Sequence, residues 1–139
     1  VVGWCEEDYE AKLNELQDKG LVQFYGFQKD VTPFISKAHA FVLPSYHEGM
    51  ANTLLESAAM GRPLITSNIH GCMEAVEDGK TGYLCEVGNV QSLSERMECF
   101  INLPYEEKVQ MGKLSHDYVA KYFDKKAVVQ ETVDVIYQN

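Results

Sequence analysis

Short apolar runs alternate along the chain with stretches in which apolar residues recur every three or four positions. Runs of the first kind predict β-strands, and spacings of the second kind predict amphipathic helices. Strands are predicted over residues 21–25, 41–43, 63–66 and 83–85, with residues 1–3 as the end of another strand. Helices are predicted over residues 6–19, 52–60, 73–77, 90–101, 106–121 and 125–137, with a short helix up to Lys37 that Asp30 or Thr32 caps.

This order of elements predicts an α/β fold, a Rossmann-like three-layer α/β/α arrangement with a helical C-terminal tail. Its strands are parallel and its helices cover both faces of the sheet. Ligands bind such sheets beyond the carboxyl ends of the strands. The loops at those ends cover residues 3–4, 26–28, 45–51, 67–74 and 86–88, and each of the five contains glycine. We therefore expect the functional site in these loops.

Composition and charge exclude several classes of function. The 139 residues fit one domain, and 12 Lys and Arg against 21 Asp and Glu give a net charge of −9. This balance argues against binding to nucleic acid or to anionic lipid. No apolar run is long enough to span a bilayer, and there is no signal-peptide pattern. The four cysteines lack metal-binding spacing, so we interpret them as reduced thiols of a cytoplasmic protein.

Glu48 and Glu56 lie on either side of the predicted start of the helix over residues 52–60. If that helix begins near Met50 or Ala51, Glu56 is within its first two turns and Glu48 stands before it. Free N–H groups at the helix start would lie between the two acids. Hydroxyl groups could bind the acids while a diphosphate binds the N–H groups. The spacing therefore suits a sugar nucleotide.

Each candidate residue also has a plainer interpretation. The backbone N–H groups could hold a diphosphate, or Ser45 or Asn52 could simply cap the helix. Glu56 could accept hydrogen bonds from a ribose, or it could be a solvated helix acid. Glu48 could contact the sugar and stabilise charge at the anomeric carbon, or it could stabilise the helix dipole. The predicted diphosphate-binding segment comprises Gly49, Met50, Ala51, Asn52, Thr53 and Leu54, with Ser45 beside it.

Other rim residues carry weaker predictions. Gly26, Phe27 and Gln28 follow a predicted strand and could receive a base, although Phe27 could equally belong to the core. We interpret Glu74 as a structural first-turn acid and expect Arg62 to meet carbonyls at the end of its own helix. The four histidines, at positions 39, 47, 70 and 116, are interpreted as structural or solvated. The sequence contains no Ser-His-Asp order, metal-ligand cluster or Walker-type loop.

Several short motifs follow one another along the chain: residues 24–26 (FYG), 38–45 (AHAFVLPS), Glu48-Gly49 with Glu56, 61–66 (GRPLIT), Gly71 with Glu74, and 78–82 (DGKTG). In this order and spacing they resemble the nucleotide-sugar-binding half of retaining glycosyltransferases of GT-B architecture (glycosyltransferase group 1, or GT4). Two departures are a Glu-Gly-Met-Ala-Asn loop where the family often has Glu-Gly-Phe-Gly, and His70-Gly71 where two glycines are common.

The resemblance implies that Glu48 touches the donor sugar and Glu56 the ribose. It also implies that amides from Gly49 through Leu54 hold the diphosphate and that residues 26–28 receive the base. No metal or other cofactor is expected. By this resemblance residues 1–139 are a donor-binding domain truncated at its N-terminus. A basic phosphate clamp and the acceptor-binding domain would then lie upstream of Val1.

The resulting hypothesis is a glycosyltransferase that moves a hexose-type residue from a UDP- or GDP-sugar, in a pathway such as polysaccharide biosynthesis. The acceptor, whether glycan, lipid-linked sugar or small molecule, would bind the missing half, which could also mediate peripheral membrane association. This chain alone is expected to be inactive. A sugar-nucleotide epimerase, a phosphorylase and a non-catalytic interaction domain remain as alternatives.

Overall fold

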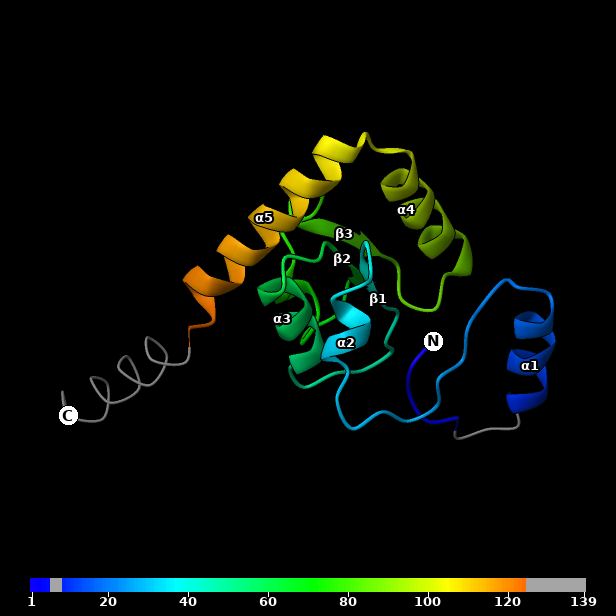
Figure 1. Ribbon diagram of the computed structural model, residues 1–139. Helices are drawn as coiled ribbons and strands as arrows, with labels where there is room; N and C mark the ends of the chain where they lie inside the picture. The colour runs from blue at the N-terminus through cyan, green and yellow to red at the C-terminus, as the bar shows by residue number, and fades with distance from the viewer. Residues whose placement is uncertain (6–8, 125–139) are drawn as a thin grey trace, which may run out of the picture. The chain divides into compact units, whose positions relative to one another are not determined.

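The computed structural model describes residues 1–5 and 9–124, and the chain divides into two compact units, Val1–Ser36 and Lys37–Asn139. The helix predicted over residues 125–137 lies outside the described residues. The first unit contains helices α1 (Glu10–Asp18) and α2 (Thr32–Ile35). The second contains strands β1 (Phe41–Leu43), β2 (Leu64–Ser67) and β3 (Gly82–Cys85), helices α3 (Asn52–Ala59), α4 (Val90–Asn102) and α5 (Tyr105–Tyr122), and the 3₁₀ turn η1 (Met73–Ala75) (Figure 1).

The strand predicted over residues 21–25 is wrong, because this segment is extended but belongs to no strand of the structure. It does pair with the start of the chain: Tyr25 N–H donates to the Val1 carbonyl at 3.0 Å, and Gly3 N–H donates to the Gly26 carbonyl at 2.9 Å. A regular parallel ladder would use the carbonyl of residue 25 for the second bond. Val1 N–H also donates to the Gln23 carbonyl at 2.6 Å, so the pairing is regular around Val1 and slips by one residue at Gly3. The ladder therefore does not continue into a strand pair.

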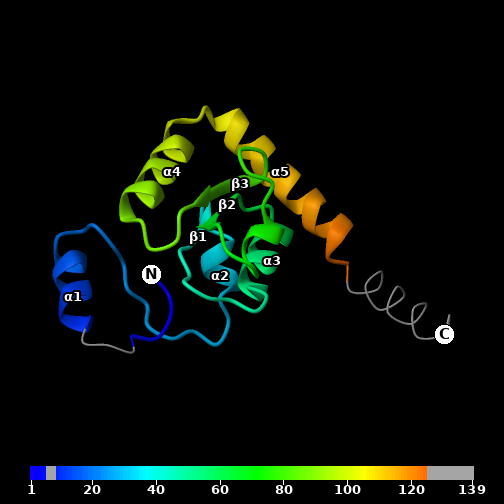
Figure 2. The ribbon, with the colours of Figure 1, turned by 180° about the vertical axis from the view of Figure 1, so that it is seen from behind.

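The sheet of the second unit is parallel, with the order β1-β2-β3. Phe41 pairs with Leu64, and Leu64 pairs with Gly82. Because right-handed crossovers in sequential order fall on one face of a sheet, α3 and η1 cover the same face. Helix α4 follows the last strand and packs on the opposite side, as the two views agree (Figures 1 and 2). The predicted Rossmann-like three-layer arrangement is confirmed.

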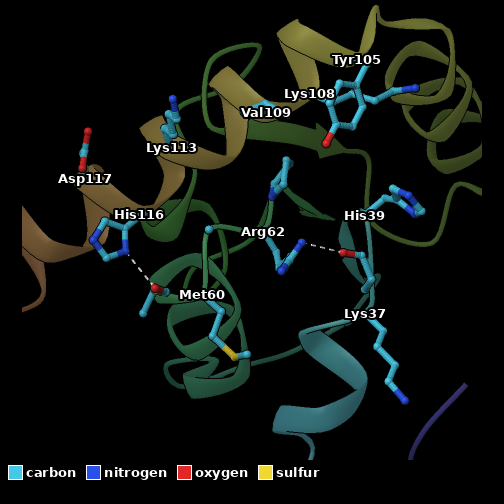
Figure 3. A pocket seen from close by; sticks show the side chains of 14 residues that line it. Lys37, His39, Met60, Arg62, Tyr105, Lys108, Val109, Lys113, His116 and Asp117 are labelled. Carbon is cyan, nitrogen blue, oxygen red and sulfur yellow. Dashed lines mark hydrogen bonds between the residues drawn. The ribbon is translucent and has the colours of Figure 1, made fainter.

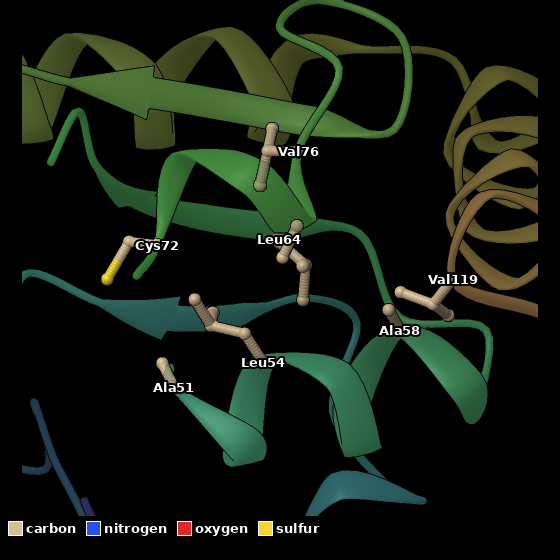
Figure 4. Close-up of a cluster of buried hydrophobic side chains, with 8 residues drawn as sticks. Ala51, Leu54, Ala58, Leu64, Cys72, Val76 and Val119 are labelled. Carbon is tan, nitrogen blue, oxygen red and sulfur yellow. The ribbon is translucent and has the colours of Figure 1, made fainter. Parts of the chain in front are cut away.

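Alternate residues of β2 belong to two separate cores. Leu64 packs with Leu54 and Ala58 of α3 on one face (Figure 4). Ile65 packs with Phe100 of α4 and Met111 of α5 on the other. All four residues of β2 are buried, as expected for a central parallel strand.

Helix α5 contributes to both cores, since Met111 belongs to one and Val119 to the other. It approaches the turn after α3 closely: a Cβ at Gly112 would lie 2.4 Å from the Gly61 carbonyl oxygen, so only glycine fits there. The Ser115 hydroxyl donates to the Arg62 carbonyl at 3.1 Å. Among the described helices, none is both long and apolar enough to cross a bilayer.

Candidate functional site

At the carboxyl edge of the sheet, the loop that follows β2 contacts both the end of β3 and the loop that follows β1. Asn68 N–H, after β2, donates to the Cys85 carbonyl of β3 at 2.8 Å. Ala51 N–H, after β1, donates to the Gly71 carbonyl at 2.9 Å. These bonds assemble the predicted rim from segments that are far apart in sequence. The part of the rim that lies in the second unit is thus one connected structure.

Glu48 is held in place by a neighbour in its own loop. The Ser45 hydroxyl donates to Glu48 Oε1 at 2.7 Å, and both side chains are half-buried. A hydrogen bond to an ionised carboxylate is short and strong, so it fixes the direction of the acid. The second carboxylate oxygen meets no hydrogen-bond donor among the described residues. Glu48 is therefore oriented, with one oxygen available to a ligand.

The start of α3 is uncapped by any side chain. Its N-cap is Ala51, with no side-chain hydrogen bond, and the helix begins at Asn52. The interpretation of Ser45 or Asn52 as a cap is therefore wrong, because Ser45 binds Glu48 and Asn52 is already helical.

Two of the six predicted diphosphate donors are occupied by the protein itself. Ala51 N–H binds the Gly71 carbonyl, and Leu54 N–H binds the Ala51 carbonyl at 2.9 Å. Asn52 and Thr53 are exposed, and no acceptor within the described residues meets their N–H groups. Two adjacent free N–H groups at a helix start form an anion-binding position. Gly49 and Met50 are exposed in the loop just before it.

Glu56 lies on the outer side of α3, where it is exposed. It lines a hollow of about 360 Å³ together with Ala59 and residues of α5 and its end, including Val119 and Phe123. Glu48 is not among the described residues that line this hollow. Use of both acids by one ligand stays a prediction.

The predicted base-binding segment belongs to the first unit. Phe27 is 56% exposed and Trp4 is 75% exposed, and their rings stack with centroids 4.7 Å apart and planes inclined by 23°. Phe27 is therefore not a core residue. Gln28 Nε2 donates to the Tyr25 carbonyl at 2.7 Å, which orders the segment after Gly26.

A larger hollow, of about 740 Å³, lies at the opposite edge, among residues that precede β1 and β2 and residues of α5. Three of its nitrogen-bearing side chains contact backbone carbonyls of the fold. Arg62 donates to the Ala38 carbonyl at 2.9 Å, and His116 Nδ1 lies 2.8 Å from the Ala59 carbonyl (Figure 3). Lys108 donates to the Ile101 carbonyl at 2.8 Å. Arg62 thus bridges to the segment before β1 through its side chain, while its backbone N–H meets the Ser57 carbonyl of its own helix end at 3.0 Å.

The buried thiols are poor nucleophiles. Burial raises the pKa of Cys72 above its usual value, and the charge of Glu48 adds to the rise although a Thr66 hydrogen bond opposes it. Burial likewise raises the pKa of Cys85. Within residues 1–5 and 9–124, no three His, Cys, Asp or Glu side chains are grouped as metal ligands would be. The expectation of a metal-free site stays a prediction.

The prediction of Glu74 as a structural first-turn acid is confirmed, and its carboxylate also reaches back to the loop before it. Its Oε2 accepts from Gly71 N–H at 2.8 Å, and its Oε1 lies 3.1 Å from His70 Nδ1. The hydrogen bond from its own N–H, and then the contact with His70, hold the pKa of the Glu74 carboxyl below its usual value. The spacing of Gly71 and Glu74 was the available signal, because a side chain three residues on can reach back to a loop N–H group.

Comparison with known sequences identifies relatives of one kind. The sequence model of the family described as "Glycosyl transferases group 1" matches residues 1–102. The N,N'-diacetylbacillosaminyl-diphospho-undecaprenol alpha-1,3-N-acetylgalactosaminyltransferase of Campylobacter jejuni is 29% identical over 112 residues, covering 81% of this chain and 29% of the relative. The N-acetyl-alpha-D-glucosaminyl L-malate synthase of Bacillus anthracis is 30% identical over 127 residues, covering 90% of this chain and 32% of the relative. The chain thus spans about a third of the length of these relatives.

Solved structures show the same fold. Anabaena HepE in complex with UDP and glucose superposes with a TM-score of 0.83 at 23% identity, covering 99% of this chain and 40% of that one. The C-terminal domain of a glycosyl transferase group 1 family protein from Francisella tularensis superposes with a TM-score of 0.72 at 21% identity, covering 85% and 64%.

Proposed function

The chain belongs to the glycosyl transferases group 1 family, and on that premise we propose that it binds the UDP-sugar donor of a retaining hexosyltransferase. The observation that carries this proposal is the uncapped start of α3 beside an oriented carboxylate. The complex of HepE with UDP and glucose supports a uridine nucleotide over a guanosine one. The acceptor, the pathway and a cytoplasmic location belong to the same proposal and depend on the whole protein.

In this proposal the diphosphate binds the N–H groups of Asn52 and Thr53, for which the described part of the chain supplies no acceptor. The helix dipole adds about half a positive charge at that position. As the sugar leaves, negative charge grows on the departing phosphate, and donors that are already in place stabilise it. No proton transfer from the protein is needed at this step.

In this proposal Glu48 and Glu56 bind different parts of the donor. Glu48, which Ser45 orients, accepts from sugar hydroxyls and stabilises positive charge that develops at the anomeric carbon. Glu56 accepts from the ribose hydroxyls, for which its exposed carboxylate offers two oxygens. The base contact at residues 26–28 is part of this proposal, with the exposed ring of Phe27 as its stacking surface.

Titration calorimetry with UDP, GDP, ADP and a UDP-hexose tests these roles. We expect Glu56→Ala to weaken UDP binding about ten- to a hundredfold, because a hydrogen bond to a charged group contributes about 1.5–3 kcal/mol. We expect Glu48→Ala to leave UDP binding unchanged and to weaken binding of the UDP-hexose. Fluorescence of Trp4, the single tryptophan, gives a second signal because its ring stacks on Phe27.

Glu98→Ala, which removes an exposed acid from α4, is the control for a general change of charge. Equal losses of UDP affinity in the Glu48 and Glu56 variants would show that the two roles are misassigned. If no nucleotide gave a binding heat, this result would contradict donor binding and favour a non-catalytic domain. Epimerisation of a free UDP-sugar without acceptor would favour the other enzyme class.

A further inference from the structure

The loop after β2 packs directly against the loop that carries Glu48. A Cβ at Gly71 would lie 2.6 Å from the carbonyl oxygens of both Glu48 and Gly49, and the φ of Gly71 is +86°. No side chain fits between the two backbones. Together with the bond from Ala51 N–H to the Gly71 carbonyl, this close approach places Gly71 directly against the segment from Glu48 to Ala51.

Gly71 is in turn held by Glu74. The Glu74 carboxylate accepts from Gly71 N–H at 2.8 Å, and the Tyr118 hydroxyl of α5 donates to the Glu74 carbonyl at 3.2 Å. The contact with His70 contributes less, because the His70 side chain is 94% exposed and Glu74 38%. A stabilising role toward a helix dipole is also weak, since η1 has only three residues. The bond to Gly71 N–H is the contact that links this carboxylate to the loop before α3.

We propose that Glu74 is a positioning residue of the donor site, which acts through Gly71 to set the geometry of the Glu48–Ala51 loop. The proposal rests on the proposed function for its effect on ligand binding, but its effect on the loop does not. In this proposal Glu74 itself makes no contact with the donor. The carboxylate fixes one N–H group, the glycine fixes the loop, and the loop sets Glu48 and the start of α3.

Two variants of Glu74 separate positioning from general stability. Glu74→Ala removes the acceptor, whereas Glu74→Gln keeps a carbonyl oxygen that can accept from Gly71 N–H. Glu77→Ala is the matched control, because Glu77 is a nearby exposed acid that pairs with Lys80 at 2.7 Å. Amide hydrogen exchange at Gly71, Ala51 and the core residue Leu64 is measured in the free chain, and UDP-hexose affinity by calorimetry.

In Glu74→Ala we expect the rate of amide hydrogen exchange at Gly71 and Ala51 to rise about tenfold. We expect the dissociation constant for the UDP-hexose to rise by the same factor, which corresponds to about 1.4 kcal/mol. Exchange at Leu64 should stay unchanged, Glu74→Gln should recover most of both losses, and Glu77→Ala should behave as the parent chain. Unchanged exchange at Ala51, equally faster exchange at Leu64, or no recovery in Glu74→Gln would overturn the proposal. Should the parent chain bind no nucleotide, the proposed function fails, and the exchange data alone decide whether Glu74 positions the loop.

Discussion

Gly71 lies so close to the neighbouring loop that a single added methyl group would clash with its backbone. Its φ is +86°, and an added Cβ would meet two backbone carbonyls at 2.6 Å. Gly79 shares the left-handed conformation, with a φ of +75°, but has nothing within 4 Å of an added Cβ. Alanine substitutions at these two glycines can therefore be compared directly, because the positions share a backbone conformation and differ only in the space around an added Cβ.

We expect Gly79→Ala to lower the free energy of unfolding by about 1–2 kcal/mol, the cost of a left-handed non-glycine residue. Gly71→Ala adds a clash with backbone, so we expect a loss of about 2–5 kcal/mol and weaker UDP-hexose binding. Urea unfolding and calorimetry measure the two effects. Equal losses of stability in both variants would mean that the loop with Glu48 and Gly49 moves aside freely. The close packing of Gly71 would then not determine the geometry of the candidate site.

At the scale of elements, α3 connects the core to the candidate site, because its start presents free N–H groups and its inner side is fully buried. Leu54 has no exposed surface and packs in the core with Leu64 and Ala58. We expect Leu54→Ala to cost about 2–5 kcal/mol of unfolding free energy, through lost burial and the cavity left behind. Urea unfolding followed by circular dichroism measures this loss.

Leu21→Ala is the control for that substitution, since Leu21 is 68% exposed and should change the unfolding free energy by less than about 0.5 kcal/mol. If Leu54→Ala were as mild as the control, α3 could not be anchored by the core as described. A loss of UDP affinity at temperatures where the variant is still folded would extend the effect from the core to the helix start.

Most elements of the second unit could be predicted from sequence because their signals are local. The run before Pro44 predicted β1 with its observed bounds, and α3 ends one residue before the predicted Met60. The segment over residues 21–25 has the same apolar pattern, but its pairing with residues 1–3 slips by one residue at Gly3. Composition does not encode this slip. Local pattern identifies an extended segment, whereas a strand also needs a partner in register.

The candidate site was predicted in part, for the same reason. The helix start and Glu48 follow from spacing along one stretch of chain. The roles of Gly71 and Glu74 required knowledge of which loop lies against which, since the carbonyls of Glu48 and Gly49 come from a different strand connection. Contacts between separate loops are tertiary information, so the sequence presented Glu74 only as a first-turn acid.

At the scale of the whole molecule, the chain spans about a third of its curated relatives and consists of two compact units. The elements that carry Glu48, Glu56 and Glu74 all belong to the second unit. The predicted base-binding segment belongs to the first. Loop substitutions in the second unit should therefore affect sugar and diphosphate contacts while leaving the stacking of Trp4 on Phe27 intact.

The start of α3 offers a diphosphate only uncharged donors, the backbone N–H groups and the side chains of Asn52 and Thr53, and the segment from Ser45 to Leu54 contains no lysine or arginine. A chain of net charge −9 then repels an incoming nucleotide over distances set by the Debye length, about 30 Å at 0.01 M salt and about 8 Å at 0.15 M. Added salt should therefore speed the association of UDP with this chain in stopped-flow measurements, while uncharged uridine is unaffected. A rate that falls with salt would instead reveal cations that steer the nucleotide to its site.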